Sequence, residues 1–195
     1  TGPGAMHPRA LDAISDKGLQ SIADIFMQCE EVRSWPVGRL EATMVRLPKP
    51  EGGCRLIALL HSLIRVWGRV RRPESARWES KNRCDVIFGT GPGKSASDSA
   101  FMRNLQAEVA HLLWECSITM LLDLIKCFEM VDYRYLMDEA MNLGYPLVMA
   151  WMCIQTFTQP RRIKGYHSIS YEFVPAQGVL AGDGQATTLL MVFTL

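Results

Sequence analysis

Two stretches of the chain combine β-type residues with a central turn, and both lie between segments whose apolar residues recur every three or four positions. The first covers residues 42–59 (ATMVRLPKPEGGCRLIAL), and the second covers residues 161–175 (RRIKGYHSISYEFVP). Each predicts a β-hairpin, because two β-type runs flank residues that favour turns. Strands that alternate with helices fit α+β or α/β folds, and the hairpins favour α+β.

Helical spacing predicts most of the remaining elements. Ser15 is available as the N-cap of the first helix, and a short apolar run predicts a strand over residues 117–123. Three tryptophans, Trp67, Trp114 and Trp151, are expected in the core. The helices are predicted at 15–32, 61–72, 98–116, 132–142 and 147–158, and a last one follows a glycine-punctuated loop within 176–195.

The composition describes a globular protein of one domain or slightly more, because 48% of the 195 residues are hydrophobic and 21% are charged. No apolar run reaches the roughly 18–20 residues that cross a bilayer, so no membrane partner is expected. The N-terminus lacks the apolar region of a secretory signal, which indicates an intracellular protein. The chain also begins without Met, as expected of a fragment.

The spacing of cysteines and histidines argues against zinc. Successive cysteines lie 11 to 32 positions apart, so no closely spaced pair exists to start a zinc site, and the four histidines are scattered. The thiols are therefore expected to be reduced and mostly buried.

The charged residues are unevenly distributed. The formal net charge is +1, but residues 33–83 carry twelve basic and four acidic side chains, or +8, which leaves −7 for the rest of the chain. A basic segment of this size suits a polyanion such as nucleic acid, and it also suits a solvated helix face. The candidate nucleic-acid-binding residues lie on the outer face of the helix predicted at 61–72 and are Arg65, Arg69, Arg71 and Arg72.

The glycine-rich sequence GTGPGKS suggests the phosphate-binding loop of an NTPase, in which Lys94 would contact the phosphates. The spacing of that motif, GxxxxGK[ST], requires glycine at position 88, where this chain has Phe88. An NTPase is therefore the less favoured alternative.

The segment LLDLIKCFEMVDYR carries the candidate catalytic residue. Asp123 ends a predicted strand, and a carboxylate at the end of a rigid strand can hold a divalent cation for phosphoryl transfer. Phe128 follows five residues later and can place a flat apolar wall beside the same pocket. By itself Asp123 is more simply explained as a helix-capping or surface carboxylate, so further motifs decide its role.

Three further segments complete a set of four. They are LPKPEGGCRLI at 47–57, GPGKSASDSAF at 91–101 and AQGVLAGDGQATTLL at 176–190. Together with DLIKCFEMVDYRYLM at 123–137, they resemble the motifs of the reverse transcriptase family, most closely the non-LTR, LINE-like type. The family patterns are, in chain order, xPKPxxxxRPI, GFRPGRSTEDAxF, DLxKAFDxVDHRxLL and (P)QGxxLSP.

The resemblance implies an α+β polymerase right hand. Residues 1–118 would form a fingers region that includes the N-terminal helix, and residues 119–195 would form part of the palm. The implied reaction is template-directed transfer of a deoxynucleotidyl group to a primer 3′-hydroxyl, with Mg²⁺ or Mn²⁺ as cofactor. The partners would be an RNA template, a DNA primer and a dNTP, and the location would be nuclear, while the oligomeric state stays open.

The resemblance also implies roles for individual residues. Asp123 would be catalytic and a metal ligand, and Leu124 would offer its backbone carbonyl to the second metal ion. Phe128 would exclude a ribose 2′-hydroxyl. The other nucleotide-binding residues would be Lys49 and Arg55, which hold the triphosphate, and Gln177 and Gly178, which allow the backbone to approach the template base and the incoming nucleotide.

Two departures from the family pattern keep a second interpretation open. The third palm motif of the family supplies an adjacent aspartate pair, and no such pair follows Asp123 here, so we expect a fragment that is truncated before that motif and inactive by itself. Ala176 and the Ala181–Gly182 pair replace the family's Pro and Ser-Pro. The alternative is a catalytically inactive retroelement remnant that only binds nucleic acid.

Overall fold

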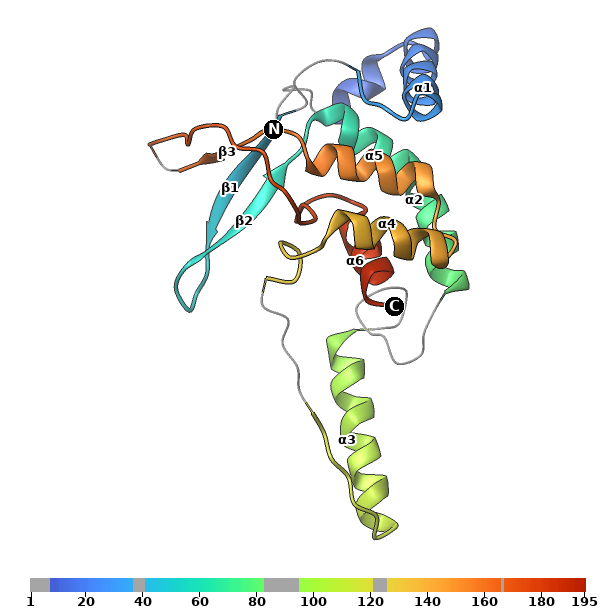
Figure 1. The fold of residues 1–195 in the computed structure, drawn as a ribbon, viewed down its shortest axis with the longest axis vertical. Helices are drawn as coiled ribbons and strands as arrows, with labels where there is room; N and C mark the ends of the chain where they lie inside the picture. The colour runs from blue at the N-terminus through green and yellow to red at the C-terminus, as the bar shows by residue number, and fades with distance from the viewer. Residues whose placement is uncertain (1–7, 37–40, 83–94, 121–125, 166) are drawn as a thin grey trace.

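The computed structural model describes residues 8–36, 41–82, 95–120, 126–165 and 167–195, which form a mixed α and β structure (Figure 1). A short 3₁₀ helix (Pro8–Ala13) comes first. The helices are α1 (Asp16–Glu31), α2 (Ser62–Lys81), α3 (Ala96–Leu112), α4 (Tyr133–Asn142), α5 (Leu147–Phe157) and α6 (Ala186–Thr194). The strands are β1 (Ala42–Pro48), β2 (Cys54–Leu59) and β3 (Arg161–Lys164).

A three-stranded sheet in the order β2-β1-β3 contains the first predicted hairpin. In that hairpin β1 and β2 are antiparallel, with Leu47 opposite Arg55, and Lys49 lies in the connecting turn. The second predicted hairpin is reduced to isolated bridges such as Arg161 with Phe173. Instead, β3 pairs with β1 in parallel. The sheet therefore joins segments from both ends of the chain.

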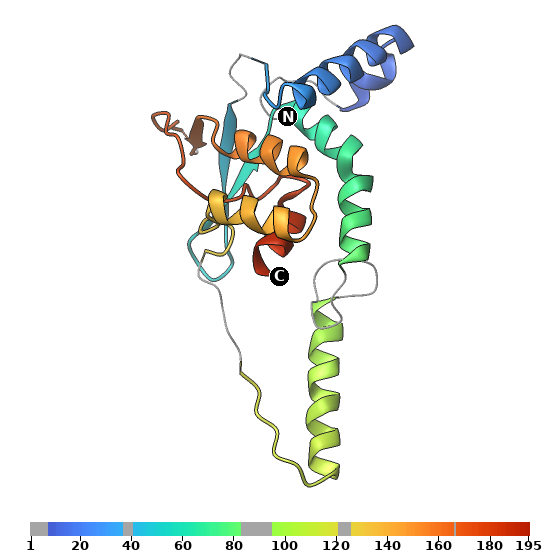
Figure 2. The ribbon, with the colours of Figure 1, turned by 45° about the vertical axis from the view of Figure 1, so that its right-hand side comes forward.

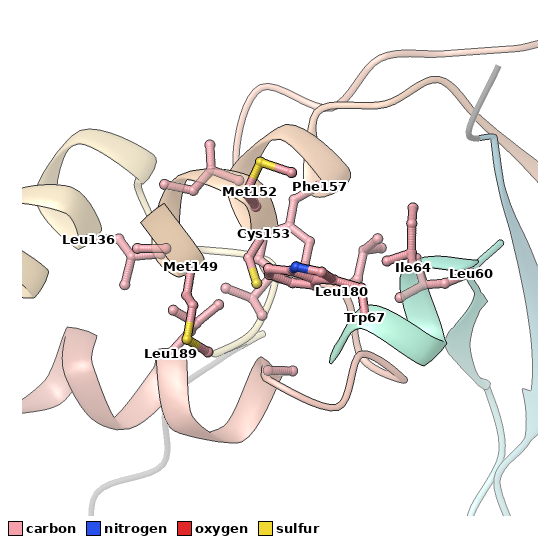
Figure 3. Close-up of a cluster of buried hydrophobic side chains, with 14 of the residues drawn as sticks. Leu60, Ile64, Trp67, Leu136, Met149, Met152, Cys153, Phe157, Leu180 and Leu189 are labelled. Atoms are coloured by element: carbon pink, nitrogen blue, oxygen red, sulfur yellow. The ribbon is translucent and has the colours of Figure 1, made fainter. Parts of the chain in front are cut away.

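The core lies between one face of this sheet and helices α2, α4, α5 and α6 (Figure 3). Trp67 is 2% exposed and packs edge-to-face against Trp35, as predicted for a core residue. The same prediction was wrong for Trp114 and Trp151, which are 94% and 43% exposed. The indole of Trp151 instead donates a hydrogen bond to the backbone carbonyl of Arg33 at the surface.

Helix α2 continues well beyond the predicted end at Arg72 and passes through Pro73. The second half of the helix is retained because it buries side chains of its own: Ser75 and Trp78 are 0% and 5% exposed. The Trp78 indole also donates to the carbonyl of Leu143 across the interface with α4. This packing offsets the backbone hydrogen bond that proline removes.

Helix α3 begins at a capping box formed by Ser95 and Asp98, and none of its residues is buried. It lies apart from the other helices in both ribbon views (Figure 2). The strand predicted at 117–123 is absent from its described part, where Ile118 and Met120 are 94% and 77% exposed. A strand needs a neighbour for its backbone groups, and no described strand runs beside residues 117–120.

No helix in the described parts of the chain is long and apolar enough to cross a membrane.

Candidate nucleotide-binding site

The predicted metal ligands Asp123 and Leu124 lie outside the described residues, as does Lys94 of the glycine-rich loop. Among the residues that are described, no three acidic, cysteine or histidine side chains are grouped so that they could hold a metal ion. The site is therefore built from the nucleotide-binding candidates alone.

A loop over residues 176–184 joins two segments that are distant in the sequence. The Gly178 N–H donates to the Val131 carbonyl at 2.9 Å, and the Val179 N–H donates to the Phe128 carbonyl at 2.7 Å. On its other side the loop meets the sheet, because the Ala58 N–H donates to the Ala181 carbonyl at 2.8 Å. The structure thus places Phe128, Gln177 and Gly178 together, and the same loop contacts strand β2 three residues further along, at Ala181.

Two glycines allow this close approach. Gly178 has φ +97°, and a Cβ added there would lie 2.9 Å from the Glu129 carbonyl oxygen. Gly182 has φ +113°, and a Cβ there would lie 2.6 Å from the Ala58 carbonyl oxygen. Glycine tolerates both the positive φ and the lack of space. The sequence interpretation assigned Gly178 to the approach of a template and nucleotide, and in the structure the open side of both glycines faces the chain's own backbone.

The side chains of this group differ in exposure. Phe128 is half-buried and packs against the core, while Gln177 is exposed and donates to the Glu129 carbonyl at 3.3 Å. Tyr133, at the start of α4, donates its hydroxyl hydrogen to the Gly178 carbonyl at 2.8 Å. Residues 126–133 and 176–184 therefore share side-chain contacts as well as backbone contacts.

Lys49 and Arg55 lie on the hairpin whose second strand borders the loop. The turn around Lys49 is closed by backbone hydrogen bonds with Gly52 and Gly53, and Arg55 is exposed on β2 three residues before Ala58. Within the described parts of the chain neither cation has an ion pair. Both remain available to an anion.

The four candidate nucleic-acid-binding arginines divide into two pairs. Arg65 and Arg69 are exposed on α2 and have no ion pair among the described residues. Arg71 forms two hydrogen bonds with Glu30 of α1, and Arg72 forms two with Glu79, at 2.7 and 2.9 Å. Arg71 and Arg72 are therefore paired with carboxylates of the protein itself rather than exposed for phosphates as the charge pattern had predicted.

The Arg72 contact is part of the packing between α2 and α6. Burial favours a raised pKa for the Glu79 carboxyl, but hydrogen bonds from Arg72 and Thr188 outweigh it and hold that pKa below its usual value. The Arg72 guanidinium also reaches the Thr188 hydroxyl of α6, at 3.1 Å. Removal of Arg72 would leave a partly buried carboxylate without its cation.

We expect the double variant Arg65→Gln and Arg69→Gln to weaken RNA binding in a salt-dependent manner. Loss of two phosphate contacts should reduce the slope of log K against log salt by about 1.4 for a single-stranded RNA. The slope is measured by fluorescence anisotropy with a labelled RNA between low and moderate salt. The matched control is Lys17→Gln with Arg103→Gln, which removes two exposed cations on other helices. An equal change in slope for both double variants would contradict the assignment.

Asp183, in the same loop, has no role in the sequence predictions. Its carboxylate accepts a hydrogen bond from the Gln185 N–H at 3.2 Å and lies 3.9 Å from where a Cβ on Gly68 would be. Burial raises the pKa of Asp183 to about 6, against the opposing effect of the Gln185 and Gly184 N–H groups. The pKa of the neighbouring Cys153 thiol is also raised, first by burial and then by Asp183.

Gln185 ties this part of the loop to α2. Its side-chain amide donates to the Gly68 carbonyl at 2.9 Å, and its oxygen accepts from the Ser75 hydroxyl at 2.5 Å. The Ser75 hydroxyl also lies 3.3 Å from the Tyr145 hydroxyl. One sign of these contacts is visible in the sequence, where several polar residues interrupt an otherwise apolar final segment.

The loop over residues 176–184 thus contacts segment 126–133 through Phe128 and Val131, and strand β2 through Ile57 and Ala58, whereas no contact joins Lys49 or Arg55 to Phe128, Gln177 or Gly178 among the described residues. The chain matches no family model, and it matches no curated protein. The function assigned to this place consequently depends on its geometry and on the motifs themselves.

Proposed function

We propose that this chain carries the nucleotide- and template-binding part of a reverse transcriptase, with a right-hand polymerase arrangement of fingers (1–118) and partial palm (119–195). The observation that carries the proposal is the pair of backbone hydrogen bonds, from Gly178 to Val131 and from Val179 to Phe128. They join the two palm-like motifs, which are about 45 residues apart in the chain. A nucleotide site built from both motifs needs such contact.

The surrounding residues suit a nucleoside triphosphate. Phe128 offers a half-buried ring, and Gln177 offers an exposed amide next to it. Arg55 provides a guanidinium fork, which matches phosphate oxygens geometrically, and Lys49 provides a second cation. Both stand on the hairpin that borders the loop. In this proposal Asp123 and the backbone carbonyl of Leu124 would hold Mg²⁺ or Mn²⁺, and the bound metal would supply Lewis-acid chemistry for phosphoryl transfer.

A second candidate function is nucleic-acid binding without catalysis. Its support is that Arg65 and Arg69 are exposed and form no ion pair with any other described residue, so they can contact phosphates whether or not a metal site exists. This function predicts salt-sensitive binding of RNA with no nucleotide addition.

The two functions are separated by a primer-extension assay on an RNA template with a labelled DNA primer, dNTPs and Mg²⁺. We expect the fragment to be inactive by itself, so the protein assayed continues through the family's aspartate pair, and this unchanged chain should add nucleotides to the primer. Asp123→Asn should lower the rate of addition by at least about 10³-fold, because the metal loses a charged ligand. Binding of the primer–template should stay within about twofold of the unchanged chain, because phosphate contacts dominate that affinity.

The matched control is Asp138→Asn, which neutralises an exposed carboxylate on α4. Addition that survives in Asp123→Asn as it does in Asp138→Asn would remove Asp123 from the mechanism. Salt-sensitive RNA binding without any addition by the unchanged chain would support the second function. Failure to bind the primer–template at low salt would exclude both.

A further inference from the structure

One peptide unit in the site is held from both sides. The unit joins Gly178 to Val179: its carbonyl accepts the Tyr133 hydroxyl at 2.8 Å, and its N–H donates to the Phe128 carbonyl at 2.7 Å. Glycine restricts the rotation of the adjacent peptide less than any other residue does. The orientation of this peptide unit therefore depends on these two hydrogen bonds.

Tyr133 is itself fixed. It is the first residue of α4, whose N-cap Asp132 accepts hydrogen bonds from the next two N–H groups, of Arg134 and Tyr135. The guanidinium of Arg161, only 7% exposed as a residue, lies beside the Tyr133 phenol and also donates to the Phe157 carbonyl. A hydroxyl that is half-buried and next to a cation remains a good hydrogen-bond donor.

The Tyr133 hydroxyl keeps its proton at neutral pH. Burial raises the pKa of Tyr133, while the positive charge of Arg161 acts in the opposite direction without cancelling the effect of burial. Arg161 has no acidic partner among the described residues, and burial lowers its pKa. The arrangement thus places a neutral donor at the Gly178 carbonyl.

We propose that Tyr133 is a positioning residue for sugar discrimination: it holds the Gly178–Val179 peptide in the orientation that fixes the backbone of Phe128. The inference rests on the proposed function, in which the Phe128 ring lies against the sugar of the incoming nucleotide. Without the Tyr133 hydroxyl the Gly178 carbonyl loses its partner, and the peptide can rotate away from the Phe128 carbonyl. The Phe128 ring is then no longer held in one position against the sugar of the nucleotide.

The test compares Tyr133→Phe with two matched variants. Tyr145→Phe removes another buried phenol hydroxyl, which lies 3.3 Å from the Ser75 hydroxyl and not at the Gly178 carbonyl, so it reports a general loss of stability. Tyr135→Phe removes a hydroxyl from a half-exposed tyrosine of the same helix, whose ring packs on Phe193. The two readouts are hydrogen exchange at the Val179 amide and equilibrium binding of dGTP and GTP with Mg²⁺ and primer–template.

In Tyr133→Phe we expect exchange at Val179 to be about tenfold faster than in Tyr145→Phe, as loss of one buried hydrogen bond implies. The preference for dGTP over GTP should fall by about fivefold or more, while Tyr135→Phe keeps the original preference. Exchange no faster than in Tyr145→Phe would overturn the positioning role. Faster exchange with an unchanged preference would overturn the link to sugar discrimination. If the unchanged chain binds neither nucleotide, the proposed function fails, and the assignment of Tyr133 fails with it.

Discussion

Replacement of Gly182 by alanine should lower the free energy of unfolding by about 3 kcal/mol, which combines backbone strain with a steric clash. The residue has φ +113°, a conformation that L-amino acids rarely adopt. A Cβ would also lie 2.6 Å from the Ala58 carbonyl oxygen and 3.2 Å from the Ile57 side chain. Backbone cannot yield as a flexible side chain can, so the loop must move away from β2.

The measurement is urea unfolding followed by circular dichroism, with Gly184→Ala as the matched control. Gly184 lies two residues further along the same loop, and a Cβ there would meet nothing within 4 Å. We expect Gly184→Ala to change the free energy of unfolding by less than about 1 kcal/mol. Similar losses in the two variants would show that the loop does not depend on contact with β2.

Local patterns in the sequence predicted most of the elements that the described structure contains. The Ser15 cap and the apolar spacing that follows predicted α1, and the Pro-Gly-rich turn predicted the hairpin of β1 and β2. These elements could be predicted because their signals lie within one turn of helix or a few residues of strand. Asp132, the first residue of the helix predicted at 132–142, is the N-cap of α4.

Long-range contacts could not be predicted in the same way. The parallel pairing of β3 with β1 joins residues about 120 positions apart, and no local pattern specifies it. The continuation of α2 through Pro73 depends on the burial of Ser75 and Trp78 against other helices. Tertiary packing overrides local preference in both cases.

In the candidate site, too, local motifs could be predicted from the sequence, whereas long-range contacts could not. The motifs indicated that Phe128, Gln177 and Gly178 act together, and the described structure places them together. The motifs could not indicate that Arg71 pairs with Glu30, because 41 positions separate the two residues. This ion pair follows from the packing of α1 on α2. It neutralises Arg71, which the charge pattern had assigned to nucleic-acid binding.

Asp183→Asn should stabilise the protein at pH 7 by up to about 3 kcal/mol. The pKa of the Asp183 carboxyl is raised to about 6 from an ordinary value of 3.8, because the effect of burial exceeds that of the hydrogen bonds from the Gln185 and Gly184 N–H groups. At pH 7 the folded protein must therefore keep a charge in a site that favours the neutral form. Asparagine is neutral, and its side-chain oxygen can still accept from the Gln185 N–H.

The dependence on pH identifies this effect. Below pH 3.8 Asp183 is protonated in both the folded and the unfolded chain, so Asp183→Asn should have nearly the same stability as the unchanged chain. Between pH 3.8 and 6 the unfolded chain releases the proton while the folded chain retains it, and the stability of the unchanged chain falls relative to the variant. Above pH 6 the difference should reach a plateau.

The groups that face Asp183 do not produce this difference, because both proteins carry them. They are the Cys153 thiol and the Tyr145 hydroxyl. Urea unfolding of the two proteins from pH 3.5 to 8 gives the difference curve, with Asp138→Asn, on the exposed side of α4, as the control. A constant difference over this range would show that the Asp183 carboxyl is solvated in the folded protein. A difference in stability that grows as the pH rises to about 6 would show that packing of the loop against α2 has an electrostatic cost. The contacts that keep the loop in place despite this cost are the hydrogen bonds of Gln185 with Gly68 and Ser75.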